Sequence, residues 1–369
     1  MDRFSMTSPA LIAHPLERKL EDRAIKRARV LEILDAAARD SVLLTSHTTL
    51  SWYLDGSRIG ISLAGDPIAA LLVTHDGDHL VTFNNEAQRL IAEEIPAGVT
   101  VHEIPWHGSL SDVASWLGPG IFPATESELA TPLRLARRSL LPGELSRYEL
   151  LCRDSATILT DVLSQATPQT TERQIAAALA ERVVAAGADP LVLLTSGASR
   201  AAFRHPLPTD SALGRRAMAV VCARRDGMIA NVTRWVRFDD GTSAERDAEA
   251  RIANVESDIF DATVPGASIA HVFSEIQAAY PRHGFGPDQW QLHHQGGPAG
   301  YAGRDPRATV AVADTIALNQ PFTWNPSGPG VKIEDTVLLS SEGIRPLSVD
   351  HRWPTTKVNG IDRPITLQR

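Results

Sequence analysis

Short apolar and polar segments alternate along the first half of the chain. Apolar runs at 41–46 and 67–83 predict strands, and the segment 84–95 has the spacing of a helix. Asp76 and Gly77 stand between two apolar stretches of the second run, and a D-G pair in that setting predicts a tight hairpin turn. Strands followed by a helix predict an α/β arrangement for this half.

The second half of the chain repeats one pattern. Helical spacing over 140–165 and 170–188 is followed by strand-like runs, and helical spacing over 243–263 and 268–280 is followed by more of them. The strand-like runs cover 191–197, 217–238, 309–319 and 331–343. Two helices and then strands, given twice, predict an antiparallel sheet covered on one face by two helix pairs, an α+β arrangement.

The length of the chain favours two domains. Single hydrophobic cores stop growing at roughly 250–300 residues, and this chain has 369. Pro142 and Gly143 stand directly before the long helical stretch that opens the second half, a position typical of a helix start. We therefore predict a smaller α/β domain over 1–139 and a larger one over 140–369.

Composition narrows the partners and the compartment. With 43% hydrophobic and 22% charged residues and a net charge of -8, the chain is expected to be globular and to bind no nucleic acid, which requires clustered basic residues. Only two cysteines occur, so no disulfide framework is expected. The first 20 residues lack the apolar core of a secretory signal, and no apolar run is long enough to span a membrane. We expect a cytoplasmic protein without a membrane partner.

Four segments carry a resemblance to a known family. They are FRHPLPT (203–209), ARRDGMIANVTRW (223–235), LHHQGGPAGY (292–301) and WNPSGPGVKIEDTVLL (324–339). In this order they resemble the creatinase/aminopeptidase P family, peptidase family M24, whose last motif has the form G-V-R-I-E-D-T-V. The resemblance implies the pita-bread fold for 140–369. More weakly, SHTTLSWYLDG (46–56) suggests the creatinase-type N-terminal domain.

The resemblance also implies a metal-ligand set, and most of it is absent. Metallopeptidases of this family hold two metal ions with two Asp, one His and two Glu, because paired dications need several carboxylates to offset their charge. Here Asn231 stands at the second Asp and Val220 at the first. His294 matches the ligand histidine, with His293 as a competitor, and Glu334 keeps the last Glu.

The remaining Glu of the set falls at Asn325 or at Gln320, depending on how the spacing is aligned, and both are neutral. One imidazole, one carboxylate and amides cannot hold two divalent ions. We therefore expect no metal and no other cofactor. A single weakly held ion on His294 and Glu334 is the alternative, although it would lack the usual third protein ligand.

His205 is the predicted proton shuttle. It matches the histidine that serves creatinase-like enzymes as general acid and base, and imidazole titrates near neutrality. Creatinase, a metal-free member of the family, hydrolyses a C–N bond of a guanidino acid through a histidine. The leading hypothesis is therefore a metal-independent, creatinase-like hydrolase of a small carboxylate-bearing amide, amidine or guanidine. His294 and Glu334 complete the predicted catalytic group, unless Glu334 is simply paired with Arg234 or Lys332.

Other residues are candidates for holding the substrate. They are Arg58, Asn231, His293, Asn325 and Tyr301. Arg58 would bind a carboxylate through its guanidinium fork, and Tyr301 would donate a hydroxyl. Because neighbouring residues on a strand face opposite sides, we expect only one of His293 and His294 to enter the site.

Two other functions fit the same resemblance. One is a non-catalytic homologue that uses the fold as a binding module, since function resides in sites and not in folds. The other is a metal-dependent Xaa-Pro aminopeptidase or dipeptidase. Relatives with two such domains usually complete the site from a second subunit, so the resemblance also implies a homodimer.

Overall fold

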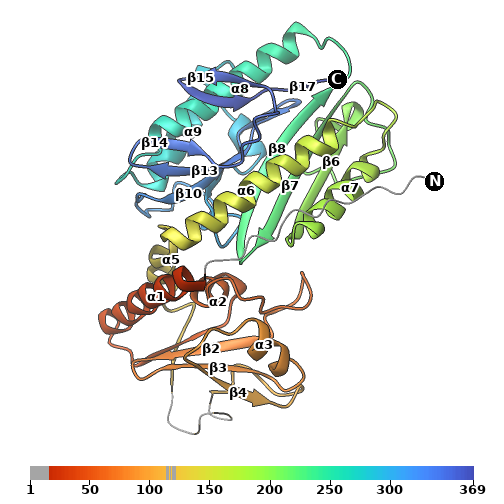
Figure 1. Ribbon diagram of the computed structural model, residues 1–369. Coiled ribbons are helices and arrows are strands. Elements are labelled where there is room, and N and C mark those ends of the chain that lie inside the picture. Colours follow the sequence, from red (N-terminus) through yellow and green to blue (C-terminus); the bar gives the residue numbers. More distant parts are fainter. Residues whose placement is uncertain (1–15, 114–115, 117, 119–121) are drawn as a thin grey trace, which may run out of the picture.

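The computed structural model describes residues 16–113, 116, 118 and 122–369 (Figure 1). Most of the N-terminal segment in which no secretory signal was predicted, residues 1–15, lies outside the described residues. Among the described residues, the first part of the chain builds one five-stranded sheet, and the part after residue 140 builds two four-stranded sheets and two two-stranded ones, with two long helix pairs.

The first part of the chain forms a five-stranded sheet with the order β4-β3-β2-β1-β5. Its elements are α1 (Leu16–Ala36), β1 (Ser41–Leu44), α2 (His47–Tyr53), β2 (Ala69–Thr74), β3 (Asp78–Phe83), α3 (Ala87–Glu93), β4 (Val99–Ile104), β5 (Ala124–Thr125) and α5 (Ala130–Arg137). Strands β2 and β3 pair antiparallel, and the Thr74 amide donates to the Gly77 carbonyl, so the predicted D-G hairpin is confirmed. Helix α1 was not predicted from the sequence.

The second part opens with the predicted helix pair and a first sheet. The elements are α6 (Pro142–Leu163), α7 (Glu172–Ala185), β6 (Asp189–Gly197), the short helix η1 (Ala198–Arg200), β7 (Arg216–Arg225) and β8 (Met228–Arg237). Thr171 begins α7 by accepting a hydrogen bond from the Gln174 amide. Leu159 of α6 and Leu179 of α7 pack in one core with Val221 and Val232 of the sheet.

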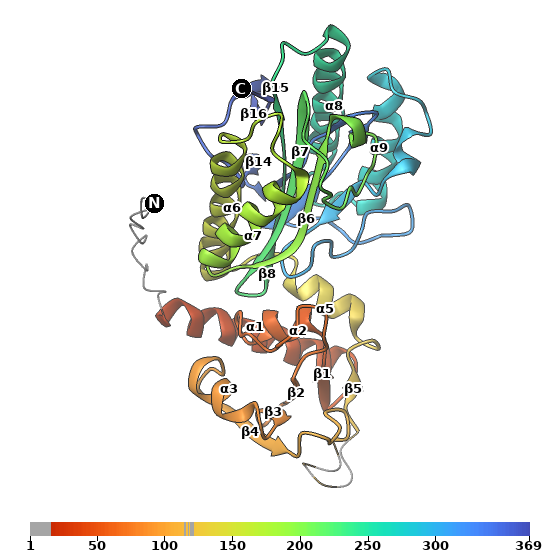
Figure 2. The same cartoon turned by 90° about the vertical axis from the view of Figure 1, so that its right-hand side faces the viewer.

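The second helix pair covers the other sheet, which has the order β14-β13-β10-β9. The elements are α8 (Ser243–Ala262), α9 (Ile269–Arg282), the short helix η2 (Gln289–Leu292), β9 (Gly296–Pro298), β10 (Gln320–Trp324), β11 (Ser327–Gly328), β12 (Val331–Lys332), β13 (Asp335–Ser340), β14 (Gly343–Pro346), β15 (Thr355–Val358), β16 (Ile361–Pro364) and β17 (Leu367–Gln368). Ile259 and Ile276 of the helices pack on Phe322 and Val337 of the sheet. The two helix pairs lie on opposite sides of the strands (Figure 2), and each packs on its own four-stranded sheet, so the single sheet predicted under both pairs is divided into two.

One predicted strand is wrong. Residues 309–319 form no strand, and the strand of this region is β10, which begins at Gln320. The backbone of 309–319 instead serves the start of α9, where the carbonyls of Val312 and Asp314 accept from the amides of Ala270 and Ile269. Helix starts leave amides without intrahelical partners, and this segment supplies acceptors for them.

The two sheets of the second part meet at β8 and β13. The Thr233 amide donates to the Glu334 carbonyl, and the Asn231 amide donates to the Thr336 hydroxyl. This contact brings two of the four motif segments side by side. The fold is thus the pita-bread arrangement of mixed α and β structure that the sequence predicted.

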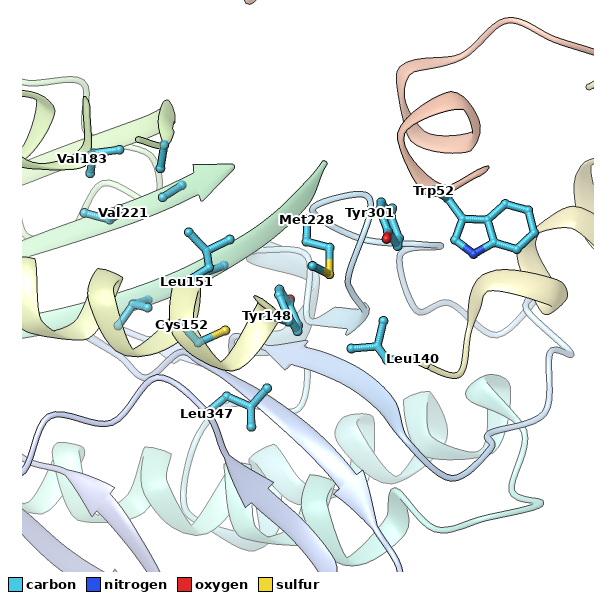
Figure 3. Packing of buried hydrophobic residues seen from close by; sticks show 14 of the residues in the cluster. Trp52, Leu140, Tyr148, Leu151, Cys152, Val183, Val221, Met228, Tyr301 and Leu347 are labelled. Atoms are coloured by element: carbon cyan, nitrogen blue, oxygen red, sulfur yellow. The ribbon is translucent and has the colours of Figure 1, made fainter. Parts of the chain in front are cut away.

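The apolar core of the first part continues into the second. Trp52 of α2, Tyr301 and Tyr148 of α6 belong to one buried cluster (Figure 3). The division of the chain at residue 140 therefore stays a prediction. Within the described part of the chain, none of the helices has both the length and the apolar character needed to cross a bilayer.

Candidate catalytic site

Three histidines from two segments meet at one point. His205 lies in the loop after η1, and His293 and His294 directly follow η2. The Nε2 atoms of His205 and His293 are 3.1 Å apart, which is hydrogen-bond distance. The ring of His294 stacks on that of His205 with a centroid separation of 5.8 Å and lies 4.6 Å from that of His293. We call these three residues the imidazole cluster.

The expectation that only one of the adjacent histidines enters the site is wrong. Both His293 and His294 contact His205. The alternation argument fails because the two residues precede β9 and are not part of a strand. His293 is 7% exposed, and its Nδ1 lies 3.3 Å from the Ser327 hydroxyl.

Burial and nearby cations keep the imidazole cluster neutral. Burial, followed by the charge of Lys332, lowers the pKa of His293 to about 3. Burial, followed by the charge of Arg304, lowers the pKa of His294 to about 4. Burial and Lys332 also lower the pKa of His205. All three rings are therefore neutral at neutral pH, so each has one nitrogen that can accept a hydrogen bond or a proton.

Glu334 lies beside this cluster with its charge already balanced. Its Oε1 is 2.7 Å from Arg304, and its Oε2 is 2.8 Å from Lys332 and accepts from the Thr233 hydroxyl at 2.7 Å. Burial alone would raise the pKa of this carboxyl, but Lys332 and Arg304 outweigh burial and hold the pKa well below its usual range. Arg234 pairs instead with Asp335 at 2.8 Å.

The sheet register places Asn325 next to Glu334. Trp324 pairs with Asp335 at the end of the β10–β13 ladder, so the following residue, Asn325, comes beside Glu334. Gln320 pairs with Leu339 at the opposite end of that ladder. Of the two alignments left open by the sequence, this register favours Asn325 as the position of the missing Glu.

Several buried polar atoms near Glu334 lack a hydrogen-bond partner among the described residues. They are Nε of Arg304, Nδ1 of His294 and Oδ1 of Asn325. Asn325 is 1% exposed, and leaving a buried amide oxygen unpaired costs about 1–3 kcal/mol. Unpaired donors and acceptors at one place are typical of a site that binds a polar ligand.

These residues do not fit a pair of divalent metal ions. Val220 sits in an apolar cluster with Leu194, Met218 and Trp235, and it offers no ligand atom. The side-chain amide nitrogen of Asn231 donates to the Thr323 hydroxyl at 3.4 Å. Both carboxylate oxygens of Glu334 are engaged by cationic side chains, so the only carboxylate kept from the ligand set has no oxygen free of a cation.

Besides the residues around Glu334, the imidazole cluster also offers ligand atoms for a single metal ion. One ligand nitrogen from each of His205, His293 and His294 lies within 4.8 Å of the others, and three histidines hold zinc in some enzymes. However, Lys332 and Arg307 act on the same rings as positive charges. Because a single carboxylate opposes them, the charge of this site disfavours a further cation.

Two predicted binding residues lie elsewhere. The guanidinium of Arg58 pairs with Glu94 at 2.5 Å, and its side chain is 73% exposed. Tyr301 donates its hydroxyl to Glu144 at 2.8 Å and is 4% exposed. Neither contacts the imidazole cluster in this chain, because each is committed to a carboxylate of its own surroundings.

Arg304, Arg307 and Lys332 were not among the site residues predicted from the sequence. Lys332 was considered only as an ordinary partner of Glu334. Arg304 and Arg307 stand a few residues after the LHHQGGPAGY segment, and an arginine pair close to a histidine motif is a signal that was available. A cavity of about 640 Å³ is lined by Thr233 and Lys332 but by none of the three histidines, so it does not open onto the imidazole cluster.

Helix-covered sheets that meet at β8 and β13, with histidines from two loops beside the junction, define the pita-bread class of hydrolase folds. A model of metallopeptidase family M24 matches residues 147–341, more than half of the chain. The chain therefore belongs to metallopeptidase family M24. No curated protein matches the chain significantly.

Solved structures share the fold at low sequence identity. A prolidase from Pyrococcus horikoshii OT3 is 16% identical over 88% of this chain and 98% of that chain, with a TM-score of 0.72. A Xaa-Pro dipeptidase from Bacillus anthracis is 12% identical over 94% and 100% of the two chains, also with a TM-score of 0.72. The N-terminal domain of the FACT complex subunit SPT16 from Cicer arietinum is 12% identical over 89% and 97%, with a TM-score of 0.65.

Proposed function

We propose that this chain is a metal-independent, creatinase-like hydrolase that cleaves a C–N bond of a small carboxylate-bearing amide, amidine or guanidine. One observation carries the proposal: three neutral imidazoles pack beside a carboxylate whose charge is balanced by Lys332 and Arg304. In the family's metallopeptidases, metal ions supply positive charge at this carboxylate. Here two side chains supply it, and the imidazoles supply the base.

His205 is the proposed acid and base, and His293 is the residue that positions it. In the tautomer that this role requires, Nδ1–H of His293 donates to the Ser327 hydroxyl, and Nε2 of His293 accepts from Nε2–H of His205. This arrangement leaves the Nδ1 lone pair of His205 free. The low pKa of His293 suits the role, because a neutral His293 remains an acceptor while His205 gains a proton.

The reaction uses one water molecule. Nδ1 of His205 takes a proton from the water as the water oxygen bonds to the substrate carbon. The protonated ring then gives that proton to the substrate nitrogen as the C–N bond breaks, and an amine leaves. The charge that develops on the substrate during the addition is stabilised by Arg304, whose Nε–H has no other partner among the described residues.

The test is a turnover assay on matched compound classes after dialysis against a chelator. Acyl amino acids, amidino acids and guanidino acids are incubated with the enzyme, and release of the amine is followed by mass spectrometry. We expect turnover in one class that is unchanged by chelation. Turnover that disappears on chelation and returns with added metal would contradict the proposal, as would no turnover in any class.

A metal-dependent Xaa-Pro peptidase is the second candidate, and the prolidase and Xaa-Pro dipeptidase that share the fold favour it. It requires at least one metal ion at residues that offer few free ligand atoms. Xaa-Pro dipeptides in the same assay, with added manganese or cobalt, distinguish it from the first proposal.

A non-catalytic binding module is the third candidate. The observation that favours it is the shared fold with a domain of a FACT complex subunit, whose name describes a complex and not a reaction. Absence of turnover across all classes, together with binding of a ligand at the imidazole cluster, would support it.

We further propose that the chain is a cytoplasmic homodimer. Isologous pairs are the commonest oligomers, and family relatives with two such domains usually complete the site from a second subunit. Light scattering across micromolar concentrations tests this, and a mass close to the 39.9 kDa of one chain would contradict it.

A further inference from the structure

A buried hydrogen-bond network runs from helix α9 to the imidazole cluster. The Tyr280 hydroxyl donates to Oε1 of Gln295 at 2.7 Å and accepts from the Ser327 amide at 3.0 Å. All three residues are at most 2% exposed. We call Tyr280, Gln295 and Ser327 the tyrosine network. It joins α9 to strand β11 and to the residue that directly follows the histidine pair.

The side chain of Gln295 determines the direction of these hydrogen bonds. Its Nε2 donates to the carbonyls of His293 at 2.7 Å and of Trp290 at 2.9 Å. Carbonyls only accept, so the atom that faces them is the amide nitrogen, and the amide oxygen faces Tyr280. The Tyr280 hydroxyl is therefore the donor in this contact. Burial raises the pKa of Tyr280 to about 12, so the hydroxyl keeps its proton at neutral pH.

Strand β11 carries the network to both histidine segments. The Ser327 hydroxyl lies 3.3 Å from Nδ1 of His293. The carbonyl of the next residue, Gly328, accepts from the Arg204 guanidinium at 2.7 Å, and Arg204 directly precedes His205. The strand that the network holds through an amide thus contacts one histidine of the cluster and the chain neighbour of another.

Gln295 also holds the opposite side of the site. Its main-chain carbonyl accepts from the Asn325 amide at 3.1 Å, and the following residue, Gly296, pairs with Trp324 in the sheet. Asn325 carries one of the buried oxygens that lack a partner among the described residues. Gln295 therefore fixes the backbone of His293 through its side chain and that of Asn325 through its main chain.

We propose that Tyr280 and Gln295 are positioning residues that hold the ring of His293 in the tautomer required for catalysis. The inference rests on the proposed function, in which Nε2 of His293 accepts from Nε2–H of His205. The Ser327 hydroxyl is the acceptor that keeps the ring proton on Nδ1 of His293. When Ser327 is displaced, that proton can move to Nε2. Nε2 of His205 must then accept, which places the proton of His205 on Nδ1 and removes the free base.

The experiment compares two variants of the network with a matched control. Tyr280→Phe removes one hydroxyl and keeps the ring contact with Phe285, at a centroid separation of 5.8 Å. Gln295→Glu keeps the side-chain shape but puts an oxygen in front of two carbonyls. The control is Tyr53→Phe, which removes the hydroxyl of a buried tyrosine in α2 that donates to Asp78. Urea unfolding measures the stability of each variant, and kinetics are taken where the variant is folded.

We expect Tyr280→Phe to lower kcat by roughly 10- to 100-fold with little change in KM, because a catalytic group that is misplaced by about 1 Å loses activity on that order. Gln295→Glu should lose more activity at about pH 8 than at about pH 5.5. Burial raises the pKa of the new carboxyl, and only its protonated form can donate to a carbonyl. Tyr53→Phe should keep the kcat of the wild type although it also loses a buried hydrogen bond.

NMR of the histidine ring nitrogens tests the same inference without a substrate. The signals of His293 are identified by their absence in His293→Gln. In the wild type we expect one tautomer of His293, with the proton on Nδ1. In Tyr280→Phe the tautomer with the proton on Nε2 should appear, whereas Tyr53→Phe should give the spectrum of the wild type.

Wild-type kcat in both network variants, or wild-type signals of His293 in Tyr280→Phe, would overturn the inference. Should Tyr280→Phe not fold, Gln295→Glu decides, and a loss of activity that is equal at both pH values overturns the inference. Failure of the proposed function gives a different result. The wild type then turns over none of the compound classes, while the tautomer of His293 still depends on Tyr280.

Discussion

Two polar clusters of this protein both bring cations and carboxylates together, but the cations are all paired in one cluster and not in the other. In the first, which we call the Lys26 cluster, Lys26 is fully buried and lies 2.7 Å from Asp55 and 2.8 Å from Glu144. Arg147 lies 2.7 Å from Asp55, and Tyr301 donates to Glu144. Each cation of this cluster is paired with a carboxylate of the cluster.

The imidazole cluster and its surroundings do not pair in this way. Glu334 takes two cations, while Arg307 has no partner among the described residues, and the rings stay neutral. The Lys26 cluster has no cation left for a ligand, and it ties α1 to α6. The second arrangement keeps free charge and free lone pairs. Because Oδ2 of Asp55 and Nε of Arg147 in the Lys26 cluster also lack a hydrogen-bond partner among the described residues, the two clusters differ in the pairing of their charges and not in unpaired polar atoms.

The largest expected effect is the loss of activity when a histidine of the imidazole cluster is removed. His205→Ala should lower kcat/KM by about 10²- to 10⁴-fold, because a positioned acid-base group contributes that much to a rate. The stability should change little, since His205 lies in an exposed loop and such substitutions stay within about 0.5 kcal/mol.

Steady-state kinetics and urea unfolding measure the two effects of His205→Ala separately. Wild-type kcat in this variant, with loss of activity in His294→Ala, would show that the base was assigned to the wrong histidine.

The second largest effect is the loss of stability when the buried cation of the Lys26 cluster is removed. Lys26→Met removes a buried cation and leaves two carboxylates under-compensated, which costs about 3–5 kcal/mol. The control is Lys357→Met, which removes an exposed partner of Asp362 and should cost at most about 1 kcal/mol. Urea denaturation measures both, and equal losses would contradict the contrast between a buried cluster and a surface pair.

The smallest effect, taken per pH unit, is the change in stability caused by the titration of His293. The pKa of His293 is about 3 in the folded protein, against 6.5 for the free side chain. Between these values the unfolded chain binds a proton at His293 that the folded chain does not bind. The contribution of His293 to the free energy of unfolding is therefore fully present above about pH 6.5 and is lost as the pH drops towards 3. The slope is at most about 1.4 kcal/mol per pH unit for this residue.

His293→Gln should remove this contribution. The stability of the variant should therefore approach that of the wild type as the pH is lowered from 7 to 4. His271→Gln, on the exposed surface of α9, is the control. The groups that act on His293 are Lys332, Glu334 and the other two histidines, and their substitution should shift the profile. An unchanged pH profile in His293→Gln would show that His293 does not titrate in this range.

The sequence predicted the parts of the fold that depend on local pattern. The D-G hairpin, the helix pairs and β13 were found because apolar spacing and turn residues determine them locally. Residues 309–319 look like a strand by composition, but their backbone supplies acceptors for the start of α9 instead. Only the packing of distant elements decides between these two uses of an extended apolar segment.

Only those site residues that lie in recognisable motifs could be predicted from the sequence. The order of the four segments led to His205, His294 and Glu334. Arg58 and Tyr301 were proposed from residue type alone, and both are committed to other carboxylates. The position of Arg307 shortly after the LHHQGGPAGY segment was a signal in the sequence, but its lack of a partner among the described residues is a property of the folded structure.

The measurement that tests the central claim most directly is the metal content of the natively purified protein. In the proposed site, Lys332 and Arg304 supply at Glu334 the positive charge that metal ions supply in the family's metallopeptidases. We therefore expect elemental analysis after extensive dialysis to find no stoichiometric transition metal, and ligand binding at the imidazole cluster to be unchanged. One or two equivalents of zinc, manganese or cobalt that survive dialysis would contradict it.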